Sequence, residues 1–243
     1  MISVVIPALD DAVMLAACLE ALVVQTRPAD EIIVVDNGST DNTTEVALAG
    51  GAMVVVEPRR GIMPATAAGF DAASGDIITR LDADSVPPPD WLARIEAAFI
   101  AQPKLTALTG PGDFYGSNRF VHWCGEFFYI GGYFWFMSLM LGHAPLFGSN
   151  LALRKTAWAR LRLTVHRNVR ELHDDLDLAF HIEPDMLVRF DPTLRVGISA
   201  RPFSSWSGLG RRLKWAYTTI RLNTRERSLA RRRAERREVQ ARA

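Results

Sequence analysis

Short apolar runs alternate with stretches of helical periodicity through the first hundred residues of the chain. Four of the runs predict buried strands, and the segments between them place apolar residues at helical spacing. The predicted strands are Ser3–Ile6 (ended by Pro7), Ile32–Val35, Ala52–Val56 and Asp76–Leu81, and the predicted helices are Val13–Val23, a helix capped by Asp41, Pro64–Ala73 and Asp90–Ala101. This alternation predicts an α/β fold with a mostly parallel sheet that helices cover on both faces.

The pattern changes after residue 110. No Asp, Glu, Lys or Arg occurs from Phe127 to Leu153, and aromatic residues crowd the first part of this run. A membrane-spanning helix needs about 20 apolar residues, but glycines, Ser138 and Pro145 interrupt the run. We therefore expect a buried or interfacial helix here instead of a span.

The remainder of the chain predicts further short elements. Residues 150–158 are amphipathic, and residues 170–183 predict a helix entered through a cluster of acids. Two short strands follow, at Leu187–Phe190 and Leu194–Ile198, and the segment from Arg211 onward is helical by composition.

Charge is distributed unevenly over the 243 residues. Residues 211–243 hold twelve Lys or Arg and three Glu, whereas residues 1–210 hold sixteen basic and twenty-four acidic residues. An acidic body with a basic tail and no recognised nucleic-acid module predicts no nucleic-acid partner. The tail fits either a solvated helix or contact with an anionic membrane surface, where each Lys or Arg contributes about 1 kcal/mol.

The two cysteines and the N-terminus indicate a compartment. Cys18 and Cys124 are far apart in sequence and have no metal-ligand spacing around them, so neither a disulfide framework nor a zinc site is predicted. The first residues lack the basic start of a signal peptide. We expect a cytoplasmic protein that is either free or peripheral on the cytoplasmic face of the membrane.

Acidic residues follow three of the predicted strands. Ligands of open α/β sheets bind at the carboxyl ends of the strands, and the segments Pro7–Asp11, Asp36–Ser39 and Asp82–Ser85 all lie there. On an extended backbone Asp82 and Asp84 point to the same side, near enough to share a hard cation such as Mg²⁺ or Mn²⁺. The alternative is that these residues form only a solvated turn followed by a helix cap, with no ligand.

Two further acidic segments allow two interpretations each. Asp36 is either a turn residue that accepts hydrogen bonds from its own backbone or a polar anchor for a ligand. Asp174, Asp175 and Asp177 favour a helix N-terminus, and one of them could act as a general base beside a bound cation. No GxxxxGKS, GxGxxG or GxSxG motif is present, which removes the main signals for ATP hydrolysis, dinucleotide binding and serine hydrolases.

Five ordered segments, VVIPALDD, IIVVDNGSTDNT, GDIITRLDADS, FGSNLALRKTAW and HDDLDLAF, resemble glycosyltransferase family 2 over about residues 1–220. The resemblance implies a GT-A fold, a nucleotide-diphosphate sugar donor of the UDP or GDP type, Mn²⁺ or Mg²⁺, and inverting transfer to a sugar or lipid-linked acceptor. It divides the domain into a nucleotide-sugar-binding half (residues 1–110) and an acceptor and base half (residues 111–210), followed by a basic tail (residues 211–243).

The resemblance also implies roles for single residues. Asp175 would be the general base, and Asp84, together with Asp82, would hold the metal. The expected donor-binding residues are Pro7, Ala8, Asp11, Asp36, Arg60 and Asp82, and the expected acceptor-side residues are Asp174, Lys214 and Trp215.

Three departures from the family pattern change these expectations. In the segment ATAAG, Thr66 and Ala67 stand where many members have polar residues that face the donor. Arg59 or Arg60 would compensate for the loss of those polar groups. RRLKW matches the Gln-x-x-Arg-Trp box of processive members only in part, and no multi-helix membrane segment follows, so processive synthesis is not expected. The alternatives are an inactive nucleotide-sugar-binding protein and a sugar-phosphate nucleotidyltransferase, which would require a Gly-rich basic loop after the first strand.

Overall fold

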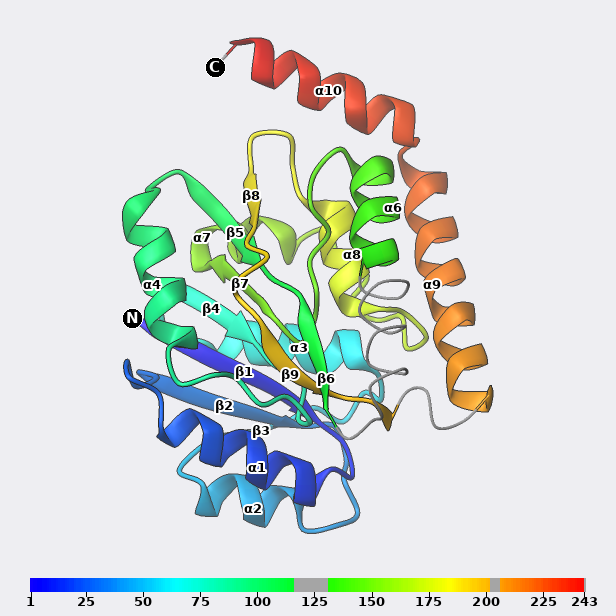
Figure 1. Cartoon of the computed structure of the whole chain (residues 1–243). Helices are drawn as coiled ribbons and strands as arrows, with labels where there is room; N and C mark the ends of the chain where they lie inside the picture. Colours follow the sequence, from blue (N-terminus) through cyan, green and yellow to red (C-terminus); the bar gives the residue numbers. More distant parts are fainter. Residues whose placement is uncertain (116–130, 202–205, 243) are drawn as a thin grey trace.

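A mixed seven-stranded sheet forms the centre of the computed structural model, which describes residues 1–115, 131–201 and 206–242 (Figure 1). The strand order is β3-β2-β1-β4-β7-β5-β8, and β6 and β9 form a separate parallel pair. The strands are β1 (Ile2–Ala8), β2 (Glu31–Asp36), β3 (Met53–Val56), β4 (Ile77–Arg80), β5 (Leu105–Thr109), β6 (Gly112–Tyr115), β7 (Leu151–Arg154), β8 (Leu187–Phe190) and β9 (Val196–Ser199). The predicted α/β fold is confirmed.

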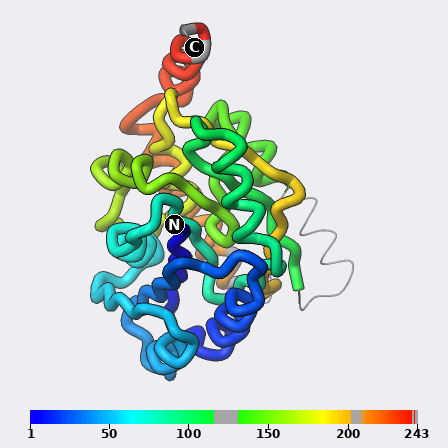
Figure 2. The backbone as a smooth tube through the Cα atoms, turned by 90° about the vertical axis from the view of Figure 1, so that its left-hand side faces the viewer, coloured from blue at the N-terminus to red at the C-terminus, as the bar shows by residue number. Residues whose placement is uncertain are grey.

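The helices alternate with these strands along the chain. They are α1 (Ala12–Val23), α2 (Thr43–Ala49), α3 (Ile62–Ala72), α4 (Trp91–Ala101), α6 (Gly132–Leu141), α7 (Lys155–Leu161), α8 (Asp174–His181), α9 (Trp206–Glu226) and α10 (Leu229–Arg242). In Figure 2 the C-terminal helix lies at the opposite end of the molecule from α1 and α2.

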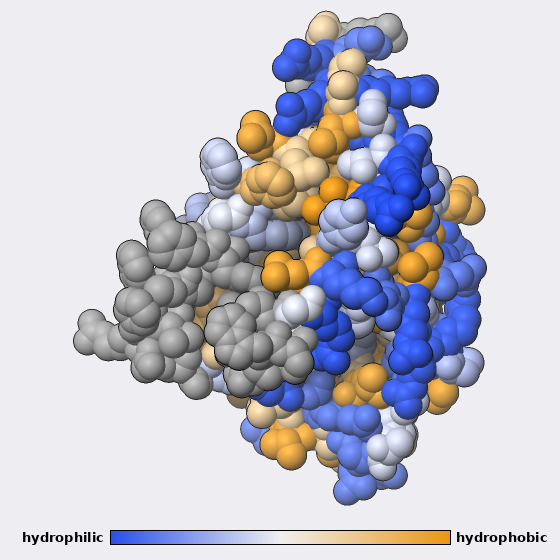
Figure 3. All heavy atoms as spheres, turned by 90° about the vertical axis from the view of Figure 1, so that its right-hand side faces the viewer, coloured by the Kyte–Doolittle hydropathy of each residue, from blue (hydrophilic) through white to orange (hydrophobic). Residues whose placement is uncertain are grey.

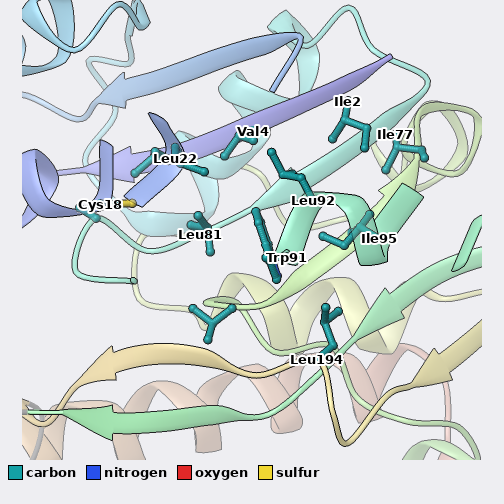
Figure 4. Close-up of a cluster of buried hydrophobic side chains, with 14 of the residues drawn as sticks. Ile2, Val4, Cys18, Leu22, Ile77, Leu81, Trp91, Leu92, Ile95 and Leu194 are labelled. Carbon is teal, nitrogen blue, oxygen red and sulfur yellow. The ribbon is translucent and has the colours of Figure 1, made fainter. Parts of the chain in front are cut away.

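Two apolar clusters pack on opposite faces of the sheet. Successive strand side chains point to opposite faces, so Val4 and Ile6 join α1, α2 and α4, whereas Val5 joins α3, α6, α7 and α8. Figure 4 shows the first cluster, in which Trp91 and Leu92 of α4 lie among side chains of β1, α1 and β4. Cys18 is a buried member of this cluster, while Cys124 lies outside the described residues.

The sheet is parallel from β3 through β4 and mixed beyond that point. Strand β7 runs antiparallel to both β4 and β5, and β5 is parallel to β8. The sequence predicted no strand at β5, β6 or β7. Strand β7 passes directly into α7 at Lys155, so its sequence looks like part of an amphipathic segment until its tertiary neighbours are known.

Strand β1 continues through Pro7, where the sequence predicted that it ends. The carbonyl of Ala8 accepts from Asn37 N–H and that of Val5 accepts from Leu81 N–H, so the backbone polar groups of residues 5 and 7 face β4. Pairing with β4 stops at Val5–Arg80. Pro7 therefore costs no ladder hydrogen bond, because the donor that it lacks would point to the unpaired side of the strand.

Three other predicted boundaries differ from the structure. The helix expected over residues 170–183 begins at Asp174, and the basic tail forms two helices separated near Ser228. The apolar segment contributes α6, while residues 116–130 lie outside the described residues. Among the described residues, no helix is long and apolar enough to cross a membrane.

The tail helices carry two kinds of arginine. Arg221 and Arg225 of α9 are exposed, but Arg232 and Arg236 of α10 donate to carbonyls at the C-terminal end of α8, including those of Phe180 and Ile182. Cations near the last carbonyls of a helix also complement its dipole. Contact of the tail with an anionic membrane stays a prediction. Of these arginines, only the exposed Arg221 and Arg225 are available for it.

We expect Arg236→Ala to lower the free energy of unfolding by about 1–3 kcal/mol, because the buried carbonyls that it bonds would be left without a donor. Arg236 is 9% exposed and its guanidinium lies 3.2 Å from the carbonyl oxygen of Glu183. The exposed neighbour Arg237 is the matched control, for which replacement by Ala should change the value by less than about 0.5 kcal/mol. Equal urea midpoints for the two variants would mean that α10 does not stabilise the body of the protein.

Candidate active site

A cavity of about 960 Å³ opens at the carboxyl ends of β1, β2 and β4. Its size is typical of a small-molecule site. All but one of the site residues expected from the sequence line it, namely Pro7, Ala8, Asp11, Arg60, Asp82, Asp84, Asp174, Asp175, Lys214 and Trp215. The exception is Asp36, whose neighbour Asn37 lines the cavity instead.

Arg80 forms the floor of this cavity. It is the last residue of β4, and its side chain is 1% exposed. Its guanidinium lies 2.9 Å from Asp82 Oδ1 and 2.9 Å from Asp174 Oδ2. These two carboxylates outweigh the effect of burial and raise the pKa of Arg80. Arg80 thus joins the D-x-D loop to the start of α8, a role that sequence reasoning missed although the charge stands out in DIITRL.

Thr66, from the unusual ATAAG segment, also contacts this floor. The Thr66 hydroxyl donates to Asp174 Oδ2 at 2.5 Å, and Thr66 is fully buried. It does not line the cavity, so it supports Asp174 and does not face a donor. Of the two arginines expected to compensate, Arg60 lines the cavity, whereas Arg59 is paired with Glu57 at 2.9 Å.

Asp82 and Asp84 lie in a turn, and the extended conformation expected from the sequence is wrong. Ser85 N–H donates to the carbonyl of Asp82 at 3.0 Å, which closes the chain directly after β4. Three prolines follow at residues 87–89, and the triplet folds back before reaching them. Both carboxylates nevertheless reach the cavity.

The two acids of the triplet have different environments. Desolvation at the cavity floor opposes the charge of Asp82, but Arg80 and the Ser149 hydroxyl that donates to it hold its carboxyl pKa below the usual range. Desolvation and the charge of Asp82 raise the pKa of Asp84, against the effect of Arg201. The surroundings of Asp82 therefore favour its ionised form, whereas those of Asp84 make its carboxyl harder to ionise.

Arg201 bridges Asp84 to Asp11. Its guanidinium lies 3.0 Å from Asp84 Oδ2 and 2.8 Å from Asp11 Oδ1. Asp11, Asp82 and Asp84 line the same cavity, and their carboxylates are oxygen donors of the type that Mg²⁺ and Mn²⁺ take. Hydrogen bonds from Arg80 and Ser149 orient the neighbouring Asp82, as outer partners of ligating carboxylates do. The residues present therefore fit a divalent cation.

The three acids at the start of α8 have three separate partners. Asp174 pairs with Arg80 as described, and Asp175 faces the cavity. Asp177 is fully buried and bonds to His166 Nδ1 at 2.7 Å and to Asn223 at 2.8 Å. His166 also contacts Glu226 of α9 at 3.0 Å, so Asp177 anchors α8 to the tail helix. The N-cap residue His173 makes no side-chain capping bond, and Asp175 Oδ1 accepts from Leu176 N–H in the first turn at 2.7 Å.

Asp175 is placed as a base would be. Its Oδ2 accepts from Gly148 N–H at 2.9 Å, and it lines the cavity together with Asp82 and Asp84. Desolvation and the charge of Asp174 raise the pKa of the Asp175 carboxyl, against His173 and Arg80. A raised pKa brings a carboxylate closer to the value that suits proton transfer near neutral pH.

Gly148 holds Arg80 and Asp175 at close range. A Cβ at this position would lie 2.3 Å from Arg80 Nη1 and 3.2 Å from Asp175 Oδ2. We expect Gly148→Ala to lower kcat about 100-fold, because displacement of a catalytic group by about 1 Å has an effect of this size. Gly132→Ala is the control, since a Cβ there meets nothing within 4 Å. Wild-type kcat in Gly148→Ala would show that the packing around Asp175 does not set the rate.

Asp36 forms the turn that one of its two interpretations predicted. Its Oδ1 accepts from the N–H groups of Gly38 and Ser39 at 3.1 and 2.8 Å, and Oδ2 accepts from the Thr44 hydroxyl at 2.8 Å. Contact with a donor stays a prediction for Asp36. The side chain of Asn37 instead accepts from Gly61 N–H at 2.8 Å and so links the β2 turn to the start of α3.

The two residues of α9 that were expected on the acceptor side from the sequence line another part of the cavity. Lys214 pairs with Glu171 at 2.8 Å, and the Trp215 ring lies 6.1 Å from that of His173. His173 Nε2 contacts the carbonyl of Arg212 at 3.0 Å. The start of α9 is therefore tied to the residues directly before Asp175.

Comparison with known proteins agrees with this geometry. The model of the family described as "Glycosyl transferase family 2" matches residues 3–159 of the chain. The chain belongs to glycosyl transferase family 2. The resemblance inferred from the five segments is thus confirmed.

Several curated glycosyltransferases are similar to this chain. A PGL/p-HBAD biosynthesis glycosyltransferase of Mycobacterium bovis is 34% identical over 134 residues, which are 52% of each chain. Glycosyltransferase AglE of Haloferax volcanii is 35% identical over 101 residues, covering 38% of this chain and 33% of its own. The chain spans about half the length, or less, of these curated relatives.

The fold is shared with a solved structure. Glucosyl-3-phosphoglycerate synthase of Mycobacterium tuberculosis, crystallised with Mn²⁺, UDP and glucosyl-3-phosphoglycerate, superposes with a TM-score of 0.67 at 21% identity, covering 92% of this chain and 79% of its own. At this identity the likeness shows the fold, which confirms the expected GT-A architecture.

Proposed function

We propose that the protein transfers a sugar, with inversion, from a nucleotide-diphosphate sugar to the hydroxyl group of an acceptor. One observation carries the proposal. A cavity at the strand ends is lined by Asp11, Asp82 and Asp84, whose carboxylates suit a divalent cation, and also by Asp175, which accepts a hydrogen bond from Gly148. Family membership and the Mn²⁺ and UDP bound by the similar synthase support it.

In the proposed reaction Asp175 takes the proton from the acceptor hydroxyl. The hydroxyl oxygen forms a bond to the anomeric carbon as the bond from that carbon to the diphosphate oxygen breaks, and the bonding pair leaves with the diphosphate. Attack on the face opposite the leaving group inverts the anomeric configuration. Gly148 N–H orients the carboxylate of Asp175, and Arg80 holds Asp82 and Asp174 in place.

Asp84 and Asp82, with Asp11 beside them, would hold Mn²⁺ or Mg²⁺. When bound, such a cation offsets the charge that develops on the leaving diphosphate. Pro7, Ala8, Asn37 and Arg60 line the part of the cavity near the ends of β1 and β2, where we place the nucleoside of a UDP- or GDP-sugar.

Melting temperatures with UDP, GDP and dTDP, each with and without Mn²⁺, test the donor site. We expect UDP or GDP to raise the melting temperature when Mn²⁺ is present, because a ligand at 100 times its Kd adds about 2.7 kcal/mol of stability. Asp84→Asn should abolish the Mn²⁺-dependent part. Asp90→Asn, an exposed acid at the end of the same loop, is the control and should leave it intact. The donor site is refuted if no nucleotide shifts the transition, or if Asp84→Asn keeps the full shift.

A further inference from the structure

Positive side chains from two segments line the cavity beside Asp175. Arg170 lies in the loop before α8, and Arg211, Arg212 and Lys214 lie in the first turns of α9. Figure 3 looks onto the side of the molecule that carries α9, where hydrophilic side chains form a broad band. Two elements distant in sequence thus bring positive charge to one part of the site.

Three of these cations have no acidic partner among the residues that the structure describes. Lys214 is paired with Glu171, but within residues 1–115, 131–201 and 206–242 no described carboxylate forms an ion pair with Arg170, Arg211 or Arg212. Arg211 lies over the Trp215 ring, 5.9 Å from its centroid. Such cations beside a cavity are available to an anionic ligand.

These arginines are near the proposed base. The carbonyl of Arg212 contacts the His173 ring at 3.0 Å, and His173 stands two residues before Asp175. Arg212 and Asp175 also line the same cavity. An anion held by Arg212 would therefore lie close to the group that takes the acceptor proton.

The charge balance of the cavity leaves room for an anion in addition to the donor. Among the residues that the structure describes, seven Lys or Arg and six Asp or Glu line it. A divalent cation and the diphosphate of a sugar donor carry equal and opposite charges, so together they leave that balance unchanged. The positive charge that remains lies on the Arg170 and α9 side, away from the Asp11–Arg201–Asp84 bridge.

We propose that Arg170, Arg211 and Arg212 bind a phosphate group of the acceptor, so that the substrate is a phosphorylated molecule with a hydroxyl beside Asp175. This rests on the proposed function and names its acceptor class. Guanidinium groups offer paired N–H donors that match phosphate oxygens. The phosphate could belong to a small soluble molecule or to a lipid head group, since the recognition chemistry is the same.

Inorganic phosphate is the first probe. It is titrated calorimetrically into the full chain at constant ionic strength, once with UDP and Mn²⁺ present and once without. We expect the Arg170→Gln/Arg212→Gln variant to bind phosphate at least about tenfold more weakly than wild type, because each lost charged hydrogen bond contributes about 1.5–3 kcal/mol. Arg225→Gln is the matched control, since Arg225 is exposed on α9 and does not line the cavity; it should bind as wild type does.

Equal phosphate affinity in all three proteins would overturn the proposal, as would no binding at all. Displacement of UDP by phosphate would also overturn it, because the arginines would then belong to the donor diphosphate. Binding of UDP with Mn²⁺ in the absence of phosphate tests the donor site separately. Arginine-dependent phosphate binding without UDP binding would support the phosphate site and refute the proposed donor.

Two competitors distinguish the sources of the phosphate. Glycerol 3-phosphate represents a soluble acceptor, and phosphatidylcholine vesicles containing phosphatidic acid represent a lipid one. Competition with inorganic phosphate by the first alone assigns a soluble acceptor, and competition by the vesicles alone assigns a lipid acceptor. Failure of both to compete, when inorganic phosphate binds, would overturn the assignment of the site to an acceptor.

Discussion

Asp175→Asn should lower kcat by about 10²–10⁴-fold, the range expected when a general base is removed, while binding of the nucleotide with Mn²⁺ is retained. The amide keeps the shape of the carboxylate and can still accept from Gly148 N–H, the bond that measures 2.9 Å in the structure. It cannot take a proton. Initial rates of sugar transfer, together with calorimetric titration of UDP, separate the two effects.

The pH profile of the same pair of proteins adds a second readout. Desolvation and the charge of Asp174 raise the pKa of Asp175, and a base works only when it is deprotonated. The wild-type rate should therefore rise with pH through a pKa above the ordinary carboxyl value of about 3.9, and this limb should disappear in Asp175→Asn. A variant that keeps more than about a tenth of wild-type kcat, with the limb intact, would place the base on another residue.

Arg80→Met should lower the free energy of unfolding by about 3–5 kcal/mol, because it leaves a buried carboxylate without its cation. Asp174 is 3% exposed, and among its described partners only Thr66 would remain. Denaturant unfolding at neutral pH measures the loss. The double variant Arg80→Met/Asp174→Leu should recover part of it, since replacing both partners of a buried pair with apolar residues is often close to neutral.

Arg160→Met is the matched control for this effect. Arg160 also pairs with two acids, Glu183 and Asp185, but its side chain is 46% exposed. Exposed pairs contribute about 0–1 kcal/mol. Equal losses for Arg80→Met and Arg160→Met would show that Arg80 does not hold the floor of the cavity.

Local pattern was sufficient for the first half of the fold. The runs that became β1, β2, β3 and β4 are apolar and bounded by turn residues, and the helices between them show clear periodicity, so both were predicted within a few residues. Strands β5 and β7 were not. Strand β7 passes directly into α7 and enters the sheet between β4 and β5 from a distant segment, and β5 pairs with β7 and β8, which come later in the chain.

In the basic tail, the sequence likewise does not predict which side chains are buried. Its arginines look alike in sequence, yet Arg225 is exposed whereas Arg236 is buried against the end of α8. Nothing local separates the two positions. Which arginines face solvent, and so could meet a membrane, depends on where α10 packs.

The sequence by itself determined the fold class, the family and the acids at the strand ends, because strand ends, turn residues and ordered motifs are local properties of the chain. Only the tertiary structure decided how these residues act together. Arg80 joins Asp82 to Asp174 across 92 positions of sequence, Arg201 bridges Asp11 and Asp84, and Gly148 supports Asp175. These interactions join segments that meet only when the sheet is assembled. The attraction between their opposite charges is strong only at the short distances that folding creates.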